Sequence, residues 1–182
     1  EIVEAGNQVM RDTGGEPGQS SGNIPEGTVQ VAAVEDYKFS PIEADKYRIN
    51  NLRRFDIEPM VLRLVCKFLE QDKGVVLLSR TKTPQYVEGG KSLQEFLRGV
   101  KSQLPKTVAD KKNRVTASTI HSYKGREEDA VIILDCFESR YPLFHPHAKF
   151  ERIWGVTPDS ISEQELNVAY VAVTRAKSEL VL

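Results

Sequence analysis

The sequence has no long hydrophobic run, few cysteines and almost no net charge. No segment of its 182 residues approaches the roughly 18–20 consecutive apolar residues of a membrane-spanning helix, and no signal segment opens the chain. We therefore expect a soluble, cytoplasmic protein without membrane contact. The net charge of −1 gives the chain as a whole no attraction for nucleic acid.

The two cysteines, Cys66 and Cys136, are too few for a disulfide framework, and we interpret them as reduced thiols. His145 and His147 lie near Cys136 in the sequence and are potential metal ligands. Three ligands without a fourth, in a segment interrupted by proline, make an incomplete zinc site. We predict that the chain holds no metal ion there.

Charge is distributed unevenly along the chain. Between Arg98 and Arg126, eight residues are basic and one, Asp110, is acidic. Taken alone, such a run is commonly a solvated face. It is also the kind of surface that attracts phosphate groups, so its meaning depends on the residues around it.

Apolar residues recur at helical spacing in three segments. The first is 57–69, which we expect Gly74 to close in a left-handed cap conformation. The second is 92–104, and the third begins at a predicted capping box formed by Ser162 and Glu165. A weaker helical pattern covers residues 2–10, and the segment 13–28, rich in Gly, Ser and Pro, is a predicted loop.

Five short apolar segments are predicted strands: 29–34, 75–78, 115–120, 130–134 and 179–182. Continuously apolar segments are typical of strands buried on both faces of a parallel sheet. Their alternation with helices predicts one three-layer α/β domain with a mostly parallel sheet over residues 1–182. Ligands bind at the carboxyl ends of strands in such sheets, so we expect functional residues just after positions 79, 120 and 135, or around the final helix.

The segment 115–134 is the first that can carry chemistry. We expect its polar turn to place Thr119, His121, Lys124 and Glu127 at one edge of the sheet. The hydroxyl, imidazole and ammonium groups can donate to phosphate or sugar oxygens, and the carboxylate can accept from ribose hydroxyls. Charged turns after strands are common, so residue types alone leave nucleotide or nucleic-acid binding open.

The second such segment is 163–182, in which a predicted helix is followed at once by a strand. Lys177 can be explained without a binding role, because basic residues near the C-terminus of a helix commonly interact favourably with the helix dipole. Arg175 differs in kind. Its planar, permanently charged guanidinium suits a phosphoryl group whose negative charge grows during transfer.

These two segments resemble motifs of a known family. The pattern T-x-H-x-x-K-G-x-E at 119–127, followed by an apolar strand, is similar to motif V of UvrD/Rep-type superfamily 1 DNA helicases. The pattern E-L-N-V-A-Y-V-A-V-T-R-A-K at 165–177 is similar to their motif VI, and weaker similarity covers 75–82 and 5–11. The resemblance implies the second RecA-like motor domain of an ATP-dependent DNA helicase, and therefore a piece of a longer chain.

The resemblance implies a nucleotide site shared with a first motor domain. Arg175 would be the arginine finger that reaches the γ-phosphate of ATP, while Glu127 and Gly125 would lie against the same nucleotide. The phosphate-loop pattern G-x-x-x-x-G-K-[ST] is absent from this sequence, so ATP and Mg²⁺ would be held mainly by the first motor domain upstream. Asp135 would suit Mg²⁺ in a different phosphotransferase, but no phosphate loop accompanies it.

The resemblance also implies contacts with the phosphate backbone of single-stranded or duplex DNA. Thr119, His121 and Lys124 would make these contacts, and Arg80 and Lys82 would contribute after an earlier strand. With these neighbours, the nucleic-acid interpretation of the basic tract gains weight, because phosphate contacts dominate such affinity.

The sequence departs from the family pattern in several places. Leu166 and Asn167 stand where many members have two arginines, and Arg126 stands where leucine is usual. Residues 91–114 are too few for the large accessory domain that many relatives insert. The alternative interpretation is a degenerate motor domain that binds DNA or protein without ATP turnover.

Overall fold

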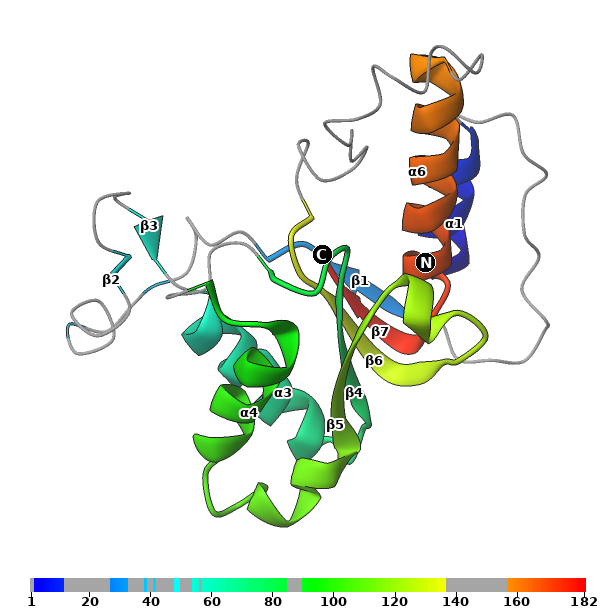
Figure 1. Ribbon diagram of the computed structural model, residues 1–182. Helices are drawn as coiled ribbons and strands as arrows, with labels where there is room; N and C mark the ends of the chain where they lie inside the picture. The colour runs from blue at the N-terminus through cyan, green and yellow to red at the C-terminus, as the bar shows by residue number, and fades with distance from the viewer. Residues whose placement is uncertain are drawn as a thin grey trace.

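The computed structural model is a parallel sheet with helices on both faces (Figure 1). It describes residues 2–11, 27–32, 38, 41, 48–49, 54–55, 57–84, 90–136 and 157–182. Most of the predicted loop 13–28 lies outside the described residues, as do His145 and His147.

Five strands form the central sheet in the order β1-β7-β6-β4-β5, and every pairing in it is parallel. Their bounds are β1 (Thr28–Gln30), β4 (Val75–Ser79), β5 (Val115–Thr119), β6 (Glu128–Ile133) and β7 (Ala176–Val181). A separate antiparallel pair joins β2 (Arg48–Ile49) to β3 (Arg54–Phe55). The predicted α/β class with a parallel sheet is confirmed.

Two pairs of helices cover the two faces of the sheet (Figure 1). One pair is α1 (Ile2–Arg11) with α6 (Pro158–Val173), and the other is α3 (Glu58–Glu70) with α4 (Leu93–Ser102). Alternate residues of β4 serve the two cores, since Leu77 packs on the side of α3 and α4 and Leu78 packs on the side of α1 and α6. Both faces of the strand are buried, so every position in it is apolar except Ser79.

The last helix begins earlier than the sequence predicted. Thr157 is its N-cap: the Thr157 hydroxyl accepts from the backbone N–H of Ser160 at 3.1 Å, and the Ser160 hydroxyl accepts from that of Thr157 at 3.1 Å. The predicted capping box at Ser162 and Glu165 is wrong, because both residues lie inside α6. Pro158 marks the true start, since proline at the first helical position has a suitable φ and no N–H to lose.

The left-handed residue after α3 is Asp72 and not Gly74. Asp72 has φ 61°, which aspartate tolerates better than most residues, and its carboxylate pairs with Arg114 at 2.6 Å. Gly74 instead begins the approach to β4, where a Cβ would collide with the carboxylate of Glu128. Gly74 is therefore not the left-handed cap of α3, and the group that a Cβ would meet is the movable end of a side chain.

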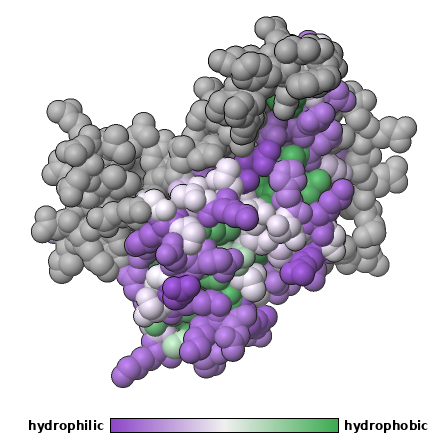
Figure 2. All heavy atoms as spheres, in the orientation of Figure 1, coloured by the Kyte–Doolittle hydropathy of each residue, from purple (hydrophilic) through white to green (hydrophobic). Residues whose placement is uncertain are grey.

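The surface of the described residues is mostly polar. On the described part of the face in view, Figure 2 shows mostly hydrophilic residues, with hydrophobic residues visible in smaller areas. Among the described residues, the exposed large hydrophobic side chains are Val3 and Val31. Within the same ranges, none of the helices combines the length and the apolar character that crossing a membrane requires.

Candidate nucleotide and nucleic-acid site

The predicted site residues of segment 115–134 lie at two ends of the sheet. Thr119 ends β5 at the carboxyl edge, and His121 opens the short 3₁₀ helix η4 (His121–Tyr123) directly after it. Glu127 directly precedes β6 and therefore lies at the amino edge. The expectation that these residues share one edge is wrong, because β5 and β6 are parallel and their connection must return from one edge to the other.

At the carboxyl edge, Arg80 joins three segments of the chain. Its Nη2 and Nε donate to the two carboxylate oxygens of Glu165 on α6, at 2.5 and 3.0 Å. Its Nη1 lies 3.1 Å from Nε2 of His121, and because a guanidinium only donates, this imidazole nitrogen accepts. The side chains of Arg80 and Glu165 are 13% and 10% exposed, so the bidentate pair is nearly buried. We call Arg80, His121 and Glu165 the Arg80 cluster.

The other predicted DNA contacts are more exposed. The Thr119 hydroxyl donates to the hydroxyl of Ser122 at 2.9 Å, which ties the end of β5 to η4. The side chains of Lys82 and Lys124 are exposed. Thr119 and Ser79 are partners in the β4–β5 ladder, so the structure brings Thr119 and His121 next to the Arg80 segment, while Lys124 follows farther along the connection.

Arg175 lies at the opposite edge, between the end of α6 and the start of β7. Its Nε donates to the carbonyl of Val171 at 2.9 Å, and Nη1 donates to the carbonyl of Arg126 at 3.2 Å. Its Nη2 donates to the hydroxyl of Thr174 at 3.1 Å. All three acceptors are neutral oxygens, and each terminal nitrogen carries a second N–H. These contacts fix the guanidinium without cancelling its charge.

Gly125 shapes the loop that meets Arg175. It has φ 82°, a conformation that favours glycine, and no atom lies within 4 Å of the position a Cβ would occupy. The conformation rather than the space requires glycine, and it directs the chain so that the carbonyl of Arg126 reaches Arg175. Glu127 follows as an exposed residue, and its predicted contact with nucleotide stays a prediction. We call Gly125, Arg126, Thr174 and Arg175 the Arg175 corner.

A comparison with protein families agrees with this architecture. The family model of the UvrD-like helicase C-terminal domain matches residues 32–182. The chain belongs to this family. The search of curated proteins found no match for the chain. The matched range contains both the Arg80 cluster and the Arg175 corner, whereas the weaker resemblance at residues 5–11 lies outside it.

In this UvrD-like domain a buried tyrosine lies close to the Arg175 corner. Tyr123 is 5% exposed, and burial together with the Glu128 carboxylate raises the pKa of its hydroxyl. The positive charges of Arg126 and Arg175 act in the opposite direction and lower this pKa. The phenol therefore stays neutral, and the charged groups that act on it are the Glu128 carboxylate and the two arginines.

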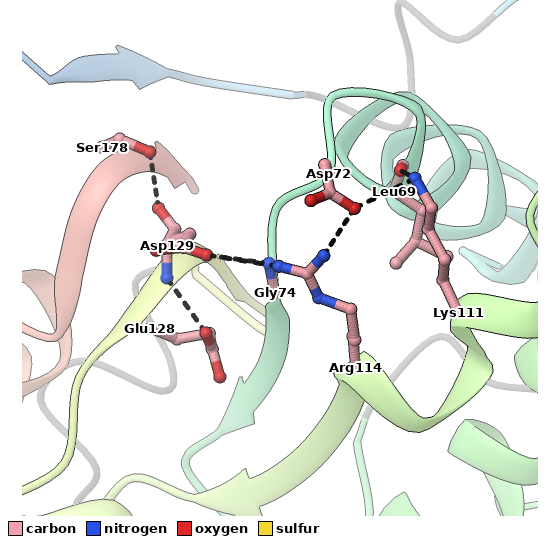
Figure 3. Close-up of polar contacts among 8 residues, drawn as sticks. All are labelled: Leu69, Asp72, Gly74, Lys111, Arg114, Glu128, Asp129 and Ser178. Atoms are coloured by element: carbon pink, nitrogen blue, oxygen red, sulfur yellow. Dashed lines mark hydrogen bonds and ion pairs between the residues drawn. The ribbon is translucent and has the colours of Figure 1, made fainter.

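The basic tract of the domain is partly neutralised by acids that are distant in the sequence (Figure 3). At the amino edge, Asp72 pairs with Arg114 at 2.6 Å and with Lys111 at 3.1 Å, and the two cations lower the pKa of this carboxyl. Elsewhere in the tract, burial and then the nearby Lys112 lower the pKa of Lys101. The tract therefore does not form one uniform positive surface. Lys111 and Arg114 have a structural role, because both form ion pairs with Asp72.

A second aspartate in the left-handed conformation follows β6. Asp135 has φ 63° and is 7% exposed, and its carboxylate accepts from the hydroxyl of Ser79 at 3.1 Å. In the part of the chain that the structure describes, no three His, Cys, Asp or Glu side chains gather as a set of metal ligands. The contact with Ser79 gives Asp135 a structural role that joins the ends of β4 and β6.

Sequence reasoning missed two residues of the site. It assigned Glu165 to a helix start and passed over Thr174, yet Glu165 holds Arg80 and Thr174 holds Arg175. A signal for Glu165 was present, because it lies three and seven residues before Val168 and Ala172 on the face of α6 that meets the core. A charged residue on such a face requires a partner.

Proposed function

We propose that this UvrD-like C-terminal domain is the second motor domain of an ATP-dependent DNA helicase or translocase, and that Arg175 is its arginine finger. One observation carries the proposal: three neutral oxygens hold the Arg175 guanidinium at 2.9–3.2 Å. A cation that is fixed but not neutralised is pre-organised to stabilise the negative charge that develops on a transferred phosphoryl group.

The nucleotide side of the proposed mechanism uses the amino edge of β6 and β7. Glu127 and Gly125 belong to the same short connection as Arg126, whose carbonyl holds Arg175. The exposed carboxylate of Glu127 is suited to accept from ribose hydroxyls. ATP and Mg²⁺ would be held mainly by the first motor domain, and Arg175 would reach the γ-phosphate when the cleft between the domains closes.

The DNA side of the proposed mechanism uses the carboxyl edge. Thr119, His121, Lys82 and Lys124 offer hydroxyl, imidazole and ammonium donors to the phosphates of a single strand. Arg80 would join them only after its bidentate pair with Glu165 opens. The connection 120–127 links the two sides, so closing and reopening of the cleft would change the grip on the strand and drive stepping.

The test is hydrolysis of ATP by the full-length protein, with and without single-stranded DNA, for wild type and Arg175→Ala. Removing the finger is expected to lower DNA-stimulated turnover by about 10³-fold while single-strand affinity is retained. Lys177→Ala is the matched control, because it removes an exposed cation two residues away. Unchanged turnover in Arg175→Ala, or none in the wild type, would support the alternative of a DNA- or protein-binding module without turnover.

A further inference from the structure

Thr174 is the side chain that touches the guanidinium of Arg175 directly. Its hydroxyl donates to the carbonyl of Tyr170 at 2.9 Å, within the last turn of α6. The same oxygen accepts from Nη2 of Arg175 at 3.1 Å. The hydroxyl therefore forms a bridge from the helix backbone to the charged group.

The methyl group of Thr174 is also held, on the side that faces α1. A Cβ placed on Gly6 would lie 3.3 Å from Cγ2 of Thr174 and 3.2 Å from Cε2 of Tyr170, so the glycine lets α1 approach closely. A β-branched side chain has few χ1 choices, and here one branch packs on α1 while the other hydrogen-bonds to α6. The direction of the hydroxyl is fixed from two sides.

We propose that Thr174 is a positioning residue whose hydroxyl sets the orientation of the Arg175 guanidinium for phosphoryl transfer. The inference rests on the proposed function of Arg175. The other two acceptors are backbone carbonyls, of Val171 and Arg126, which no side-chain substitution removes. Thr174 is thus the point at which the support of Arg175 can be removed while Arg175 itself remains.

The physical reason is the planar shape of the guanidinium. The bond from Nε to the carbonyl of Val171 fixes one point of the plane, and the contacts of Nη1 and Nη2 fix its rotation. A charged group stabilises the transition state only where the charge develops, and a displacement of about 1 Å is costly. Losing the Thr174 contact loosens this rotation without changing the charge.

The experiment compares Thr174→Val and Thr174→Ser in the full-length protein. Valine keeps the branched shape and removes the hydroxyl, whereas serine keeps the hydroxyl and removes the methyl. Thr174→Val is expected to lower kcat for DNA-stimulated ATP hydrolysis about tenfold, the worth of one hydrogen bond, with KM for ATP and single-strand affinity retained. Thr174→Ser is expected to restore most of this loss. Gln164→Ala, at an exposed position of α6, controls for general damage to the helix.

A double substitution separates positioning from structure. If Thr174 acts through Arg175, Thr174→Val has no further effect in the Arg175→Ala background, and the two losses are not additive. Additive losses, an equal loss with serine, or wild-type kcat in Thr174→Val would overturn the positioning role and leave the arginine finger standing. Wild-type turnover in Arg175→Ala alone would overturn both.

Discussion

Arg80 and Arg175 are both partly buried and both touch α6, yet their partners differ in charge. Arg80 is held by the two carboxylate oxygens of Glu165, which cancel its charge. Arg175 is held by a carbonyl and a hydroxyl at the end of α6 and by the carbonyl of Arg126 in the connection before β6, and these neutral partners leave its charge in place. Whether a partly buried arginine mainly links secondary-structure elements or can still bind an anion therefore depends on the charge of the groups that accept its hydrogen bonds.

The largest effect on stability is expected from removing Glu165 while Arg80 remains. Glu165→Leu leaves the nearly buried charge of Arg80 without its carboxylate, and we expect it to lower the free energy of unfolding by about 3–5 kcal/mol. Replacing both residues, by Arg80→Met with Glu165→Leu, is expected to cost less, because the guanidinium and the carboxylate that pair at 2.5 Å are then removed together. Urea unfolding followed by circular dichroism measures both. A single variant as stable as wild type would contradict the structural role of the pair.

The matched substitution at the other arginine sharpens the contrast. Arg175→Ala leaves only neutral oxygens, which water can satisfy near the surface, so the free energy of unfolding is expected to change by about 1 kcal/mol or less. The same urea series measures it. A loss as large as that of Glu165→Leu would show that Arg175, too, serves mainly to hold the fold.

An effect on stability smaller than that of Glu165→Leu is expected from Gly125→Ala, which alters the support of Arg175 through the backbone. A Cβ meets no atom there, but φ 82° costs a non-glycine residue roughly 1–2 kcal/mol. Relief of this strain would move the carbonyl of Arg126 away from Arg175, so ATP turnover of the full-length protein should fall together with stability. Gly125→Asn should be milder, because asparagine tolerates this conformation better. Equal effects of alanine and asparagine would point to a cause other than backbone conformation.

The smallest effect is expected at the exposed ion pairs of the amino edge, from Asp72→Asn. The hydrogen bond from Lys111, and then the charges of Arg114 and Lys111, lower the pKa of Asp72. Its folded pKa thus lies below the unfolded value of about 3.9, so the contribution to stability is present above that pH and is lost as the pH falls through the folded pKa. The difference between wild type and Asp72→Asn should be present at neutral pH, shrink in salt and vanish in strong acid. Urea midpoints measured over a pH series test this, and a difference that persists in strong acid would rule out the charge as its cause.

Asparagine is a suitable replacement for Asp72 because the residue has φ 61°. Both side chains tolerate the left-handed region, so the substitution removes the charge and leaves the turn intact.

The fold class could be predicted because its signals are local. Val75–Ser79 is apolar at four of five positions, which already indicates burial on both faces, and the alternation of such strands with amphipathic helices indicates a parallel sheet. The boundaries were harder. The pattern formed by Ser162 and Glu165 fits a helix start and a helix interior equally well. In the structure, the Glu165 carboxylate accepts from Arg80, which is 85 residues distant in the sequence, and does not cap a helix.

The candidate site was predictable in its residue types but not in its arrangement. The motif patterns at 119–127 and 165–177 identified Arg175, Glu127 and His121 from the sequence. They did not reveal that a parallel crossover separates Thr119 from Glu127, because spacing along a chain does not state which edge of a sheet a residue reaches.

By itself, the sequence determined the class of fold, the family motifs and the presence of several cations suited to phosphate. Only the tertiary structure decided which of these cations is neutralised. Glu165 on α6 lies only ten residues before Arg175 in the sequence but pairs with Arg80, and Asp72 pairs with Arg114 from a different element. The charge left for a ligand depends on such long-range partners, because an ion pair requires proximity in space and not in sequence.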